Sequence, residues 1–161
     1  MGEEDDSLEK RLGDVLRKNK LRIAVAESCT GGLISHRLTN IPGSSDYFDR
    51  GIIVYSNSSK TQLLGVPKLI LESFGAVSSE TARAMAEGIK KNANCDIGLA
   101  VTGIAGPGGS TPIKPVGLVY IGLASKKPTV VKEFRFSGKR IEVKEQASHE
   151  ALKMVLAHTP T

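Results

Sequence analysis

Apolar residues recur at helical spacing near the start of the chain, which predicts an amphipathic helix. Asp6 and Glu9 have the spacing of a capping box, so we expect this helix to begin near Asp6. The apolar stripe of the helix consists of Leu8, Leu12, Val15 and Leu16. This stripe is expected to pack against the core of the domain.

Short apolar runs alternate with helical patterns along the rest of the chain. Strands are expected at residues 22–26, 51–56, 97–102, 116–124 and 129–136. Helices are expected at residues 33–38, 59–64, 69–74, about 79–92 and 139–158, and Ser78 or Ser79 can cap the fourth of them. A short connection joins the last two strands, which indicates an antiparallel pair. The order of elements predicts an α/β fold: one domain, residues 1–161, built as a three-layer α/β/α sandwich with a mixed five-stranded sheet.

Composition narrows the class of protein. The chain has 161 residues, of which 40% are apolar and 24% charged, and neither disorder nor a membrane protein follows from these values. No apolar run approaches the roughly 20 residues that span a bilayer. The chain opens with the acidic residues that follow Gly2, whereas a secretory signal opens with basic residues and then turns apolar. We therefore expect a cytoplasmic protein that does not interact with membranes.

The net charge of +5 is too weak a signal to indicate a nucleic-acid partner. Basic residues are scattered, and the chain is 4% aromatic with no Trp, whereas single-strand binding needs aromatic stacking platforms. A modest positive balance also suits a small anionic ligand such as a phosphate ester. The two cysteines and three histidines lack the spacing of metal ligands, so no metal is expected.

Residues 26–32 place hydroxyl, thiol and carboxylate side chains between a strand and a helix. The backbone N–H groups at a helix start favour developing negative charge, so a nucleophile there would have oxyanion donors at hand. Cys29 is one possible nucleophile, but no histidine partner for it is evident. The alternative is a polar helix cap with two glycines that allow tight packing.

Residues 55–60 follow a buried strand with five polar side chains and end in Lys60. A lysine acts as a general base only if burial or nearby positive charge lowers its pKa. A neutral Lys60 could take the proton of a serine hydroxyl, as in the Ser–Lys variants of the catalytic triad. The alternative is a solvated helix cap with a surface lysine.

Residues 102–109 are rich in glycine, which lets backbone amides approach an anion closely. Their pattern is neither a Walker loop nor a dinucleotide fingerprint, and a flexible connection is the alternative. Arg140 stands at the start of the last helix, where it could hold a phosphate through two hydrogen bonds. An exposed basic helix start is the alternative for Arg140.

Together these segments resemble one family. The motifs are A-E-S-C-T-G-G, G-S-S-D-Y-F-D-R-G, Y-S-N-S-S-K, G-A-V-S, T-G-I-A-G-P-G-G and K-P-V-G. They look like the CinA C-terminal domain family, whose stand-alone members include nicotinamide mononucleotide deamidases. The resemblance implies a three-layer α/β/α fold and hydrolysis of nicotinamide mononucleotide to nicotinic acid mononucleotide and ammonia, with no metal or other cofactor.

The resemblance also implies roles for individual residues. Ser28 is the expected nucleophile and Lys60 the expected base. The residues expected to contact the substrate or its oxyanion are Cys29, Thr30, Gly31, Ser45, Tyr55, Thr102, Gly103 and Arg140. The nucleotide is the expected partner, and a homodimer is the expected assembly. The amino-terminal domain of longer CinA proteins is absent from this sequence.

Two other interpretations stay open at this point. One is a nucleotide-binding or protein-interaction module without catalysis, linked to competence or DNA damage as the CinA name suggests. The other is an amidohydrolase that acts on a different amide. An intact Ser28–Lys60 combination favours an enzyme, but sequence does not define pocket shape and hence the substrate.

Overall fold

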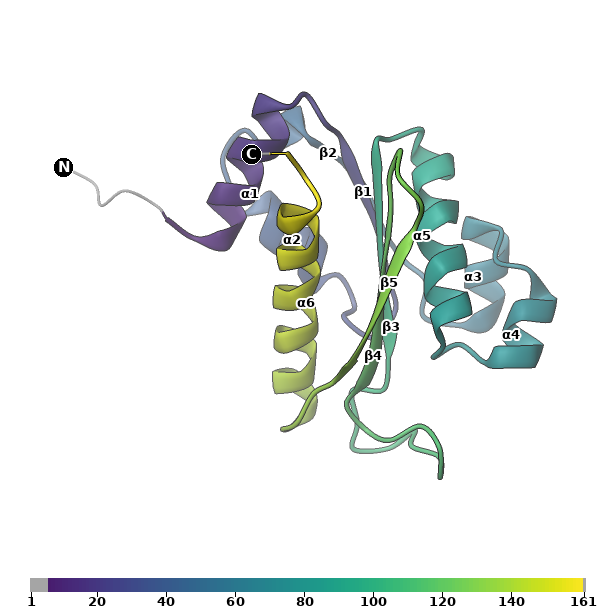
Figure 1. The fold of residues 1–161 in the computed structure, drawn as a ribbon. Helices are drawn as coiled ribbons and strands as arrows, with labels where there is room; N and C mark the ends of the chain where they lie inside the picture. Colours follow the sequence, from purple (N-terminus) through teal and green to yellow (C-terminus); the bar gives the residue numbers. More distant parts are fainter. Residues whose placement is uncertain (1–5, 161) are drawn as a thin grey trace.

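The computed structural model describes residues 6–160, which form a five-stranded sheet between two layers of helices (Figure 1). The strands are β1 (Ile23–Glu27), β2 (Phe48–Ile53), β3 (Ile97–Gly103), β4 (Leu118–Ala124) and β5 (Val130–Arg135). The helices are α1 (Leu8–Lys18), α2 (Leu33–Thr39), α3 (Asn57–Leu64), α4 (Lys68–Phe74), α5 (Ser79–Ala93) and α6 (Arg140–Ala157), with a short 3₁₀ helix η1 (Ser44–Asp46). The predicted fold class is therefore confirmed, while the acidic opening, residues 2–5, lies outside the described residues.

The sheet is mixed, with strand order β2-β1-β3-β4-β5. β1 runs parallel to β2 and β3, and β4 runs antiparallel to β3 and β5. The chain leaves β1 toward β2 on one side and later returns to β3 on the other. The carboxyl ends of β1 and β3 are therefore neighbours at the point where the connections turn to opposite sides of the sheet. Ligand sites in such sheets usually lie at this point.

Alternating strand residues supply the two halves of the core. Val25 packs into the cluster that α1, α2 and α6 cover, whereas its neighbours Ala24 and Ala26 pack into the cluster beneath α3, α4 and α5. Figure 1 shows these two groups of helices on opposite faces of the sheet. Gly98 allows the second layer to come close, since a Cβ at this position would lie 2.2 Å from the carbonyl oxygen of Ala86 in α5.

Several predicted boundaries are wrong by one to three residues, and two of these errors have a clear local reason. α1 begins at Leu8, because the hydroxyl of Ser7, not the carboxylate of Asp6, accepts the N–H of Lys10 at 3.2 Å. β2 was expected over residues 51–56, but it spans Phe48–Ile53, and it cannot continue to residue 56 because Ser56 caps α3 and accepts the N–H of Ser59.

Within residues 6–160, no helix has both the length and the apolar composition needed to cross a membrane.

Candidate active site

A cavity of about 230 Å³ lies at the carboxyl ends of β1 and β3. Ser28 enters it directly after β1, and Lys60 reaches it from the first turns of α3. The structure brings these predicted residues together around the cavity: Ser28, Cys29, Tyr55, Lys60, Thr102, Gly103 and Arg140. Ala76 and Val77, which were not predicted as site residues, also line the cavity, so five separate stretches of the chain contribute to one site.

Lys60 is fully enclosed, and its side chain is oriented by three oxygen atoms. The residue is 1% exposed, and its Nζ lies 3.0 Å from Ser28 Oγ. The same nitrogen donates to the carbonyl oxygens of Val54 at 2.9 Å and Tyr55 at 3.3 Å. The two carbonyls occupy two hydrogens of the amine and direct its remaining position at the serine. The alternative interpretation of the sequence, in which Lys60 is a solvated surface lysine, is therefore wrong.

Burial controls protonation at this site. Removal of the Lys60 ammonium from water lowers its pKa below the ordinary value of 10.5. In the neutral amine, two N–H groups still satisfy the Val54 and Tyr55 carbonyls, and the lone pair is available to the Ser28 hydroxyl. Lys60 is therefore placed to accept the Ser28 proton, and its lowered pKa favours the neutral form that a general base needs.

Cys29 lines the cavity but is not suited to act as the nucleophile. Burial is the largest cause that raises the pKa of its thiol to about 12, and the nearby Glu27 carboxylate also raises it. The thiol is therefore protonated at neutral pH, and the reactive form of a cysteine is the thiolate. Ser28 is the nucleophile that this arrangement can activate.

Glu27 is a residue of the site region that the sequence analysis did not single out. Its side chain is 0% exposed, and its carboxylate accepts four hydrogen bonds from Thr30, Ile34 and Ser35. The sequence contained a signal for this role. Glu27 is a carboxylate at the end of an apolar strand, and Gly32, at the N-cap of α2, has no side chain that could cap the helix. The carboxylate takes the place of a helix cap.

Thr102 closes the cavity on the β3 side. Its hydroxyl donates to the carbonyl oxygen of Ala76 at 2.8 Å, so the single hydroxyl hydrogen is already used. The oxygen can still accept a hydrogen bond. This geometry suits an acceptor for a substrate N–H better than a donor to an oxyanion.

Arg140 links the loops at the mouth of the cavity. Its guanidinium donates to the carbonyl oxygen of Gly106 at 2.8 Å and to the hydroxyl of Tyr55 at 2.9 Å. Both Arg140 and Tyr55 are exposed, so their polar groups can meet a ligand that enters from solvent.

Thr30 and Gly31 follow Ser28 but do not line this cavity. They face a separate hollow beside α6 that includes Lys144. The Thr30 hydroxyl donates to Glu27, and the Gly31 N–H donates to the carbonyl oxygen of Ser28 at 3.1 Å. These two residues were expected to contact the substrate, but the structure places them outside the cavity. The Thr30 hydroxyl and the Gly31 N–H already donate hydrogen bonds within the turn.

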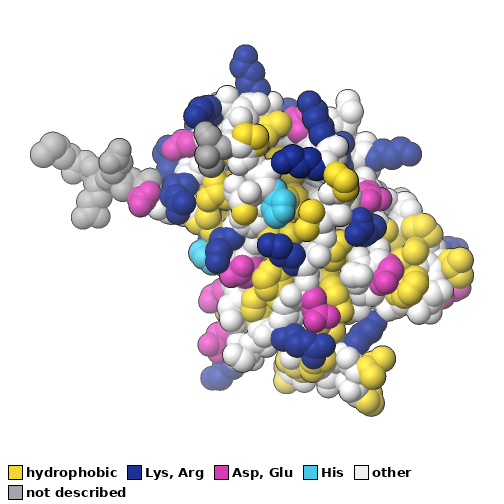
Figure 2. Space-filling model, viewed as in Figure 1, with side chains coloured by type: hydrophobic (Ala, Val, Ile, Leu, Met, Phe, Trp, Pro, Cys, Tyr) yellow, Lys and Arg dark blue, Asp and Glu magenta, His cyan; other side chains and the backbone are white. Residues whose placement is uncertain are grey.

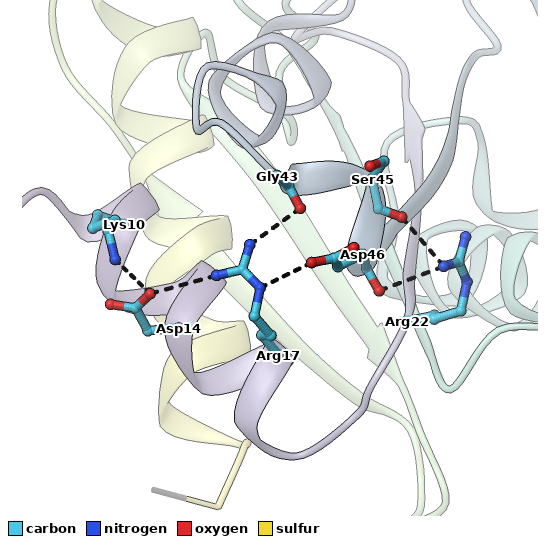
Figure 3. Close-up of polar contacts among 7 residues, drawn as sticks. All are labelled: Lys10, Asp14, Arg17, Arg22, Gly43, Ser45 and Asp46. Atoms are coloured by element: carbon cyan, nitrogen blue, oxygen red, sulfur yellow. Dashed lines mark hydrogen bonds and ion pairs between the residues drawn. The ribbon is translucent and has the colours of Figure 1, made fainter.

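Ser45 lies at the opposite end of the sheet. It belongs to η1, and its carbonyl oxygen accepts from Arg22, directly before β1, at 3.4 Å (Figure 3). Ser28 follows β1, so the five residues of this strand, about 16 Å, separate the two. The structure therefore does not bring Ser45 to the cavity of its own chain.

Charged side chains and possible metal ligands are distributed over the surface outside the cavity. On the face shown in Figure 2, Lys and Arg side chains are interspersed with Asp and Glu. Among residues 6–160, no group of three or more His, Cys, Asp or Glu is placed to hold a metal ion.

Fold and site together define an α/β domain with a buried serine–lysine pair at the carboxyl ends of its parallel strands. A family model described as the CinA C-terminal domain matches residues 5–159. The chain belongs to this family.

Proteins of several bacteria are similar over nearly the whole chain. A competence-damage inducible protein of Caldicellulosiruptor bescii is 57% identical over 92% of this chain, and a CinA-like protein of Syntrophus aciditrophicus is 51% identical over 94%. The matched region is 36% of the length of each relative, so the chain spans about a third of these proteins.

A solved structure agrees with the fold. The competence/damage inducible protein CihA from Agrobacterium tumefaciens has a TM-score of 0.88 and 39% identity, and the match covers 98% of both chains. The mixed five-stranded α/β fold is thus shared with CinA structures.

Proposed function

We propose that this chain is an amidohydrolase that needs no metal and converts nicotinamide mononucleotide to nicotinic acid mononucleotide and ammonia. The observation that carries the proposal is the 3.0 Å contact between the buried Lys60 Nζ and Ser28 Oγ inside a cavity. A buried lysine with a lowered pKa beside a serine is the arrangement that Ser–Lys acyl transfer requires.

The proposed reaction proceeds in two acyl-transfer steps. Neutral Lys60 takes the Ser28 proton while Oγ attacks the carboxamide carbon. The oxyanion accepts from the backbone N–H group of Cys29, and such a donor lowers the barrier by roughly 3 kcal/mol. Protonated Lys60 then gives its proton to the departing nitrogen, and ammonia leaves an ester on Ser28. Neutral Lys60 next takes a proton from water, and the hydroxide formed attacks the ester carbon. The bond to Ser28 Oγ then breaks, and protonated Lys60 returns its proton to this oxygen, which regenerates the serine and releases the acid.

The cavity supports entry of the amide-bearing ring rather than the whole nucleotide. Its volume of about 230 Å³ is below the range of roughly 300–1,000 Å³ usual for complete ligands. In the proposed pose, the Thr102 oxygen accepts from the carboxamide N–H₂. The phosphate remains at the mouth, where the exposed Arg140 guanidinium can bind it with two hydrogen bonds.

The first test is ammonia release from nicotinamide mononucleotide in the presence of a chelator. Wild type is expected to turn over, whereas Ser28→Ala should lose about 10⁴-fold or more in kcat and still bind the nucleotide by calorimetry. Lys60→Met should lose about 10²–10⁴-fold, the usual worth of a general base. Lys132→Met removes an exposed lysine of β5 and should behave as wild type.

Different failures of this experiment have different meanings. Full turnover by Ser28→Ala would overturn the mechanism. Loss of wild-type activity with the chelator would overturn metal independence. Binding without any ammonia release would favour a non-catalytic module or a different amide, which a panel of primary amides would separate.

A further inference from the structure

A buried carboxylate ties together the two ends of the turn that carries the nucleophile. Glu27 Oε1 accepts from the Thr30 hydroxyl at 2.7 Å and from the Ile34 N–H at 2.9 Å. Oε2 accepts from the Ser35 hydroxyl at 2.7 Å and from the Ser35 N–H at 3.0 Å. Each oxygen therefore has one hydroxyl and one backbone partner.

The four hydrogen bonds divide into two groups by where they act. Those to Ile34 and Ser35 reach the first turn of α2 and satisfy N–H groups that a helix leaves free. The one to Thr30 reaches back into the turn, two residues after Ser28. Thr30 is 1% exposed, so its hydroxyl has no water to replace this partner at low cost.

Position within this turn matters for the chemistry. The Ser28 N–H is held by the carbonyl oxygen of Val101 at 3.0 Å, which fixes the turn where it leaves the strand. The Thr30 hydroxyl bond fixes it on the other side of Ser28. Ser28 Oγ and the amides of Cys29 and Thr30 lie between these two anchors.

We infer that Glu27 is a positioning residue that acts through Thr30 to hold Ser28 in line with Lys60. This inference rests on the proposed Ser–Lys mechanism. Glu27 itself lies outside the cavity and touches no reacting atom. Displacement of a nucleophile by about 1 Å costs up to about 10²-fold in rate, so a single hydrogen bond that sets this position has a large effect on kcat.

Each oxygen of the Glu27 carboxylate accepts from one hydroxyl, so two variants can each remove one of these two hydrogen bonds. Thr30→Val and Ser35→Ala each remove one 2.7 Å hydroxyl bond to Glu27, and each leaves a backbone N–H on the same oxygen. Thr30→Val frees the nucleophile turn, whereas Ser35→Ala weakens only the helix side. Thermal unfolding of both variants measures how much stability each one loses, which separates this loss from the effect on kcat.

Kinetics and crystal structures of both variants test the inference. Thr30→Val is expected to lower kcat for nicotinamide mononucleotide about 10- to 100-fold with little change in KM, and Ser35→Ala to change kcat less than about twofold. In the Thr30→Val crystal structure, the Ser28 Oγ to Lys60 Nζ distance should exceed hydrogen-bond length, and in Ser35→Ala it should stay near 3.0 Å.

Equal kcat losses in the two variants, or an unchanged Ser28–Lys60 distance in Thr30→Val, would overturn the inference. A rise in KM with unchanged kcat in Thr30→Val would instead indicate a direct contact between Thr30 and substrate, and would also overturn it. If wild type releases no ammonia, the proposed substrate fails, and the two crystallographic distances still decide the role of Glu27.

Discussion

Lys60 differs from an ordinary lysine by its surroundings, not by its covalent chemistry. Lysines are rarely buried without a counter-charge, yet this one is 1% exposed and meets only neutral oxygens: the Ser28 hydroxyl and two carbonyls. Desolvation of the cation is the main cause of the lowered pKa. The same desolvation that prepares a base also costs stability while the group is charged.

This cost predicts a pH dependence of stability. Between the lowered pKa of folded Lys60 and the ordinary value of 10.5, the unfolded chain binds more protons than the folded chain. The free energy of unfolding therefore gains a contribution that rises with pH across this window and is absent below it. Lys60→Met has no such proton, so wild type should gain stability relative to this variant as pH rises through the lowered pKa of Lys60 toward 10.5.

Urea unfolding of both proteins at several pH values measures this difference. Other titrating groups are common to both chains and largely cancel. Lys132→Met, at an exposed position, should show a constant difference from wild type. A constant difference for Lys60→Met as well would mean that folded Lys60 keeps its ordinary pKa.

At the scale of elements, β3 and α5 pack in tight contact at the end of the strand remote from the site. Gly98 has no side chain, and a Cβ there would meet both Ala86 O at 2.2 Å and Lys90 N at 2.9 Å. These are backbone atoms of α5, which cannot rotate away as a side chain can. The two elements pack this closely only because the strand position is glycine.

Gly98→Ala should therefore destabilise the domain by about 1–3 kcal/mol, the usual cost of overpacking. Gly108→Ala is the matched control, because a Cβ at Gly108 would meet nothing within 4 Å. Denaturant unfolding of both variants measures the effect. Equal stability of the two alanine variants would contradict the close approach of α5 to β3.

At the scale of the whole molecule, the mouth of the site is formed by segments that are distant in sequence. Arg140 begins α6, Tyr55 follows β2, and Gly106 lies in the loop that projects beyond the sheet between β3 and β4 (Figure 1). The guanidinium links the three. This link depends on the planar fork of an arginine, which a lysine does not reproduce.

Arg140→Lys is expected to raise KM for nicotinamide mononucleotide by about tenfold or more, since one bidentate charged contact is worth roughly 1.5–3 kcal/mol. Its kcat should change much less, because the Ser28–Lys60 contact is untouched. Nicotinamide riboside, which lacks the phosphate, provides the comparison. An unchanged ratio of the two KM values in the variant would show that Arg140 does not bind the phosphate.

Sequence patterns predicted what depends on nearby residues. Helical and strand periodicity gave the α/β class, and the elements differ from expectation mainly at their ends, where side-chain caps such as Ser7 and Ser56 decide the boundary. Motifs pointed to Ser28 and Lys60 as partners, and the structure places them 3.0 Å apart.

Tertiary structure decided what depends on residues far apart. The pKa direction of Lys60 follows from burial, which no local pattern contains. The same holds for the exclusion of Ser45 from this cavity, because strand direction separates the two ends of β1. Local sequence sets backbone preference and chemical type, whereas distance and desolvation arise only when the whole chain packs.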